Sequence, residues 1–162
     1  MFWITRVLFL LVFALFWGGL TFYTGFVVRV SHSVLGDPMD GGLITQQVTN
    51  LLQLLGVVAV FFMALNAMVV KRQSSKFGWS LLGCTLLLSC SLVGLFVVHG
   101  HLDSVIDASA YEITNRDAFD TGHRRYNQLT TIQWLASLAY LVITVVAWRS
   151  IDATGQAGAK AQ

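Results

Sequence analysis

The sequence predicts an all-α integral membrane protein, a bundle of four helices with both termini in the cytoplasm. Four runs of the 162-residue chain contain no Asp, Glu, Lys or Arg. Each run reaches the roughly 20 residues that a helix needs to cross about 30 Å of hydrocarbon. The chain is 56% hydrophobic and 11% charged, whereas soluble domains carry about 25% charged residues. Because these charges are too few to cover a soluble surface, we expect the excess apolar surface to face lipid.

The four predicted spans are the four charge-free runs. In chain order they cover residues 7–28, 51–70, 77–98 and 129–148. With their loops they form a single membrane domain over residues 1–152, because the chain is too short to hold a separate soluble domain as well. Residues 153–162 are rich in Gly, Ala and Gln. We therefore predict that they form a disordered tail.

The links between the spans differ in length and polarity. The first link, residues 29–47, contains Gly36-Asp37-Pro38, a turn signal around the single proline of the chain. Residues 71–76 form the second link, which is so short that spans two and three are expected to be antiparallel neighbours. The third link, residues 99–128, is the longest and most polar. We expect a short interfacial helix at residues 102–107 and the fourth helix to begin at Asp117 or Asp120.

The distribution of Lys and Arg predicts the orientation of the bundle. Six of these residues lie at the termini or in the short second link, and four lie in the two longer links. Short loops that are rich in Lys and Arg remain in the cytoplasm. We therefore expect a multi-pass protein of the bacterial inner membrane, with both termini and the second link in the cytoplasm and the longer links on the outer side.

Polar side chains recur on one face of the fourth span. Gln133, Ser137 and Tyr140 follow the three- and four-residue steps of a single helix face. A polar side chain that faces lipid leaves its donors and acceptors unpaired, so we expect this face to turn toward the bundle interior. Asn50 and Gln53, near the outer end of the second span, are its predicted partners.

All four histidines fall on the predicted outer side. Imidazole is a common ligand of transition metals and haem iron, and a carboxylate often supports it. His99, His101, Asp103 and His123 therefore form a candidate metal site. For a haem b, His99 and His123 are the candidate axial ligands, with His32 in reserve. A structural hydrogen-bond cluster is the alternative, since neither an HExxH nor a paired CxxC spacing occurs.

No motif in the sequence indicates catalysis. A glycine-rich phosphate loop, a GxSxG nucleophile and a dinucleotide fingerprint are all missing from the sequence. Small residues four apart, such as Ser80 and Cys84, and the glycines of the first span offer faces for close helix packing. The first hypothesis is thus a structural or accessory protein that contacts lipid, other membrane subunits or itself, but not nucleic acid. The second is a haem- or metal-binding protein for redox chemistry or metal handling.

Three segments of the chain also resemble a known family. They are residues 16–19 with 22–28, residues 42–49, and residues 123–126 with 130–134. Together these segments resemble small four-helix membrane proteins related to the copper-resistance D-type domain (CopD-like, transmembrane protein 205-like). The resemblance implies a four-helix bundle and a link to metal handling. It implies no catalytic residue in this chain.

Overall fold

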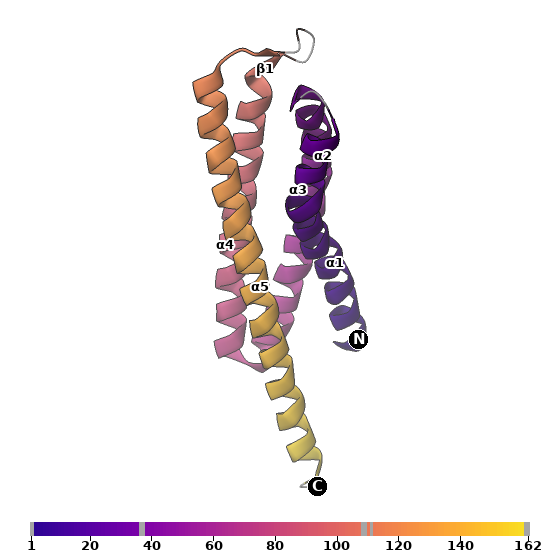
Figure 1. Cartoon of the computed structure of the whole chain (residues 1–162). Coiled ribbons are helices and arrows are strands. Elements are labelled where there is room, and N and C mark those ends of the chain that lie inside the picture. The colour runs from indigo at the N-terminus through magenta and orange to yellow at the C-terminus, as the bar shows by residue number, and fades with distance from the viewer. Residues whose placement is uncertain (1, 36–37, 108–109, 111, 161–162) are drawn as a thin grey trace.

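A computed structural model describes residues 2–35, 38–107, 110 and 112–160 of the chain (Figure 1). The first part is one long helix that consists of α1 (Phe2–Phe22), the π-helical turn η1 (Tyr23–Val27) and α2 (Val28–Val34). It is followed by α3 (Pro38–Gln73).

The second half of the chain is a pair of long helices joined by a small sheet. α4 (Ser75–Ser104) leads into β1 (Ile106–Asp107), which pairs antiparallel with β2 (Glu112–Ile113). The last element is α5 (Arg116–Lys160). In the described part of the chain, four helical segments are long and apolar enough to cross a membrane, which confirms the predicted four-helix fold.

The helices extend beyond the apolar runs, so the predicted link at residues 29–47 is wrong. α2 continues to Val34, and α3 already begins at Pro38. Proline suits the first position of a helix, because its fixed φ matches the helix and its missing N–H would have no partner there. Of the predicted turn, Gly36 and Asp37 lie outside the described residues.

The predictions for the third link and for the tail also need correction. α4 continues to Ser104, and the chain then forms the short sheet in place of an interfacial helix at residues 102–107. The first turn of α5 is capped by Asn115, whose Oδ1 accepts a hydrogen bond from the backbone N–H of Ala118 at 3.0 Å. At the other end α5 continues to Lys160, so residues 153–160 are helical where the sequence predicts a disordered tail.

Two antiparallel helix pairs make up the bundle (Figure 1). α4 packs against both α3 and α5, and α1 packs against α3. The termini lie toward one end, which we call the terminal end, and the β1–β2 sheet lies at the opposite end, the hairpin end. Apart from Ser91, the buried residues of α4 recur alternately three and four apart, as in coiled-coil packing; they are Gly78, Leu81, Thr85, Leu88, Leu92, Leu95, His99 and Leu102.

The turn between α3 and α4 is tight. Only Ser74 separates the two helices. A Cβ atom added to Gly78 would lie 2.3 Å from the Cα atom of Lys71. The first turn of α4 can therefore lie against the end of α3 only because residue 78 is glycine.

Aromatic side chains fill the space between α1 and α5. The ring centroid of Phe9 lies 5.7 Å from those of both Tyr140 and Trp148. Further along the bundle, Trp17 stacks on Trp134 with 5.5 Å between ring centroids. These rings are wide enough to connect the first and last helices of the bundle.

An ion pair joins the same two helices at the terminal end. The two terminal nitrogens of the Arg6 guanidinium donate to the two carboxylate oxygens of Asp152, each at 2.8 Å. The guanidinium also lies 4.9 Å from the ring centroid of Trp148. Such two-point pairing fixes geometry as well as charge. The first and last helices are therefore fastened together at the end where both termini lie.

Candidate functional site

A hydrogen-bonded cluster around Tyr140 occupies the centre of the bundle. The Tyr140 hydroxyl donates to the backbone oxygen of Met63 at 2.6 Å. The Asn66 amide nitrogen donates to the Tyr140 hydroxyl at 3.1 Å and to the Thr144 hydroxyl at 3.3 Å. All four residues are buried. This cluster fastens α3 to α5 through direct bonds.

The polar face of α5 lies in the bundle interior. Gln133, Ser137 and Tyr140 are all buried, and so is Gln53 on α3. Asn50 is exposed, so its predicted place on the interior face is wrong. The buried polar residue of that turn is its neighbour Thr49. Adjacent residues point about 100° apart around a helix, which turns Asn50 away from the bundle.

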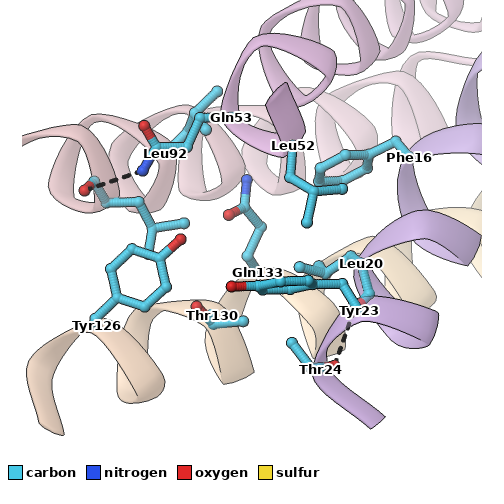
Figure 2. Close-up of a pocket in the computed structure, with 11 residues that line it drawn as sticks. Phe16, Leu20, Tyr23, Thr24, Leu52, Gln53, Leu92, Tyr126, Thr130 and Gln133 are labelled. Atoms are coloured by element: carbon cyan, nitrogen blue, oxygen red, sulfur yellow. Dashed lines mark hydrogen bonds between the residues drawn. The ribbon is translucent and has the colours of Figure 1, made fainter. Parts of the chain in front are cut away.

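A small cavity lies between the helices in the hairpin-end half of the bundle, beside η1 (Figure 2). Helices α1 and α4 line it mainly with apolar side chains, whereas α3 and α5 contribute Gln53, Tyr126, Thr130 and Gln133. The centre of a water molecule can move within about 20 Å³ of this space. The cavity is therefore very small, and its polar side chains come from η1, α3 and α5.

The π-helical turn η1 forms one edge of the cavity. Tyr23, its first residue, donates its hydroxyl to the backbone oxygen of Thr45 at 3.0 Å and lies 3.0 Å from the Thr49 hydroxyl. These contacts fasten η1 to α3. Single π-helical turns often occur at functional sites. Neither the turn nor the role of Tyr23 was predictable from the sequence, because a π-helical turn has no residue pattern of its own.

Three polar atoms at this cavity make no hydrogen bond to the described protein groups. They are Oε1 of Gln53, Oγ1 of Thr130 and Nε2 of Gln133, and all three are buried. Buried polar atoms in folded proteins nearly always have a partner. The cavity is therefore the strongest candidate site within the described residues.

His99 is the only histidine with a described side chain that is buried. Its Nε2 atom lies 3.7 Å from a carboxylate oxygen of Asp103, and its ring centroid lies 6.2 Å from that of Tyr126. The other carboxylate oxygen of Asp103 accepts a hydrogen bond from Gln46 at 2.7 Å. The predicted pair His99 and Asp103 is therefore brought together, and Gln46 connects it to α3.

The other predicted ligands do not join this pair among the described residues. His101 and His123 are exposed, and the His123 ring stacks on Phe119 with 5.9 Å between centroids. The side chain of His32 lies outside the described residues. In the described part of the chain, no group of three or more His, Cys, Asp or Glu residues is placed to hold a metal ion. Of the predicted donors with described side chains, the structure thus brings together only His99 and Asp103.

No family model, no curated protein and no solved structure matches this chain. The function must therefore be argued from the residues and the geometry described above.

Proposed function

We propose that this chain is a small structural or accessory membrane protein, a subunit of a larger membrane complex, and not an enzyme. The observation that carries the proposal is the use of interior polar groups to join one helix to another. Tyr140 connects α5 to α3, and the Trp134 indole connects α5 to α1 by donating to the Thr21 hydroxyl at 2.9 Å. A bundle fastened in this way is suited to act as a rigid scaffold.

The outer surface of the bundle supports a packing role. Gly18 on α1, Gly25 on η1 and Gly83 on α4 lie on exposed faces, and a Cβ atom at any of them would meet no atom within 4 Å. Small residues allow helix backbones to approach each other closely within lipid. We therefore propose that a helix of a partner subunit, or of a second copy, packs against these faces.

The proposed location is the inner membrane of a bacterium, with both termini in the cytoplasm. Two features support this orientation. Lys71, Arg72 and Lys76 lie in or beside the α3–α4 turn. Arg6, near the start of α1, pairs with Asp152, in the last part of α5, so the first and last helices share one end of the bundle. Basic residues near the membrane favour the cytoplasmic side.

Extraction in mild detergent from cells with native expression tests the accessory role. We expect the chain to migrate as a complex with a second membrane protein in fixed stoichiometry, or with itself. Gly18→Leu should dissociate this complex without lowering the thermal midpoint of the bundle, because the added side chain blocks close approach only from outside. Gly155→Leu, an equally open position beyond the apolar run, is the matched control. A monomer without partners would contradict the proposal.

A second candidate is a haem- or metal-binding protein, and the family resemblance implies a link to metal handling. The observation that favours it is the buried Nε2 atom of His99, which makes no hydrogen bond to the described protein groups. An absorption spectrum and an elemental analysis of the purified protein distinguish a haem- or metal-binding protein from one that binds neither. A haem band or bound metal that is lost in His99→Ala, but kept in the exposed control His101→Ala, would favour this candidate. A spectrum without either signal would rule against it.

A further inference from the structure

The cavity beside η1 is lined by residues that carry hydrogen-bonding atoms of opposite kinds. Oε1 of Gln53 is an acceptor, Nε2 of Gln133 is a donor, and the hydroxyl of Thr130 is both. Gln53 is 3% exposed and Gln133 is 2% exposed. Nε2 of Gln53 donates to the backbone oxygen of Leu95 at 3.4 Å, which leaves Oε1 as the atom available to a ligand.

The space at these atoms has the size of one water molecule. The centre of a water molecule can move within about 20 Å³ of it, and about 10–15 Å³ is enough to hold one water. Buried waters typically make about three hydrogen bonds to polar groups that lack other partners. Three such groups are present here. A water molecule therefore fits in this space without any change in the surrounding side chains.

We propose that this cavity is a binding site for a single water molecule that bridges α3 and α5. The water donates a hydrogen bond to Oε1 of Gln53 and accepts one from Nε2 of Gln133. The Thr130 hydroxyl makes the third bond. Tyr126 lies beside the same space with its hydroxyl turned toward it (Figure 2), so this hydroxyl is a further polar group at the site. This inference does not depend on the proposed function, since it holds whether or not the chain joins a complex.

The bound water explains how the two halves of the bundle differ. At the bundle centre, Tyr140 and Asn66 connect α5 to α3 by direct hydrogen bonds. In the hairpin-end half, Gln53 and Gln133 make no direct bond to each other, although both are buried. A water-mediated bridge there connects α5 to α3 instead, because such bridges are nearly as favourable in enthalpy as direct hydrogen bonds.

Nuclear magnetic resonance of the full chain in lipid nanodiscs tests the site directly. We expect the side-chain amide protons of Gln133 to show a cross-peak to a water molecule that stays bound much longer than bulk water does. Gln128 is an exposed glutamine on the same helix, and it should show only rapidly exchanging water. An assigned Gln133 amide with no contact to long-lived water would overturn the proposal.

Coupled substitutions give a second, independent test. Gln53→Leu and Gln133→Leu each remove one bond to the water, so either change alone should release it. The thermal midpoint of the double variant should then fall by less than the sum of the two single shifts. The pair Gln128→Leu and Gln133→Leu is the control and should give additive shifts. Additive shifts for Gln53 and Gln133 would show that no shared water connects them.

Discussion

Replacing Tyr140 with Ala is expected to lower the free energy of unfolding by about 3–5 kcal/mol, the usual cost of truncating a buried aromatic side chain to Ala. Tyr140 is 0% exposed. Its ring packs against Phe9 on α1, and its hydroxyl bonds to Met63 and Asn66 on α3. The substitution would create a cavity where three helices meet and would leave the Met63 carbonyl without this donor.

Tyr140→Phe is the matched control for this substitution. It keeps the ring and removes only the hydroxyl, so we expect a loss of about 1 kcal/mol, in line with interhelical hydrogen bonds in membranes. Equilibrium unfolding of both variants in mixed micelles gives the two free energies. Equal losses for the two variants would contradict the packing role of the ring, and a loss close to zero for Tyr140→Ala would contradict its central position.

Gln133→Arg is expected to have the second large effect. Gln133 is 2% exposed, and the described residues that line its cavity include no Asp or Glu. A charged side chain at the middle of a membrane helix costs about 2.5–3.5 kcal/mol even on insertion scales, and this is the upper value for Gln133, which lies near the outer end of the apolar run. The guanidinium would lie in the bundle without an anionic partner, which raises the cost further. We therefore expect severe loss of folded protein.

Gln133→Leu removes the amide without adding a charge, so it separates the effect of the charge from the effect of losing the amide. Interhelical polar contacts contribute only about 0.6 kcal/mol on average, so this variant should be mildly destabilised. For both variants, we would measure the yield of folded protein in membranes and the free energy of unfolding. An arginine variant as stable as the leucine variant would mean that this face of α5 reaches water or lipid headgroups.

Charge-free runs in the sequence were sufficient to predict the number and order of the helices, but not their ends. The runs mark where side chains can face hydrocarbon, whereas a helix continues as long as its backbone bonds and caps allow. With 45 residues, α5 is about 68 Å long, more than twice the thickness of the hydrocarbon core. Hydropathy therefore cannot predict that the helix extends through residues 153–160.

The interior polar face was predictable from spacing alone, because Gln133, Ser137 and Tyr140 repeat with the helix period. The residues that pair with this face were not predictable, because the pairing depends on how each helix is rotated and shifted against its neighbours. Asn66 pairs with Tyr140 across the bundle, while Asn50 points outward. The pairing of Arg6 with Asp152 joins residues 146 positions apart, and no local pattern signals it. The cavity depends on side-chain volumes from all four helices.

Side-specific thiol labelling tests the four-span topology most directly. In a background with Cys84 and Cys90 replaced by Ser, single cysteines are placed at the two ends of the bundle by Ala110→Cys and Ser75→Cys. In spheroplasts, a membrane-impermeant maleimide should label Ala110→Cys, at the hairpin end. It should label Ser75→Cys, at the α3–α4 turn, only after the membrane is opened. Labelling of Ser75→Cys in sealed spheroplasts, alone or together with Ala110→Cys, would contradict a four-span bundle with cytoplasmic termini.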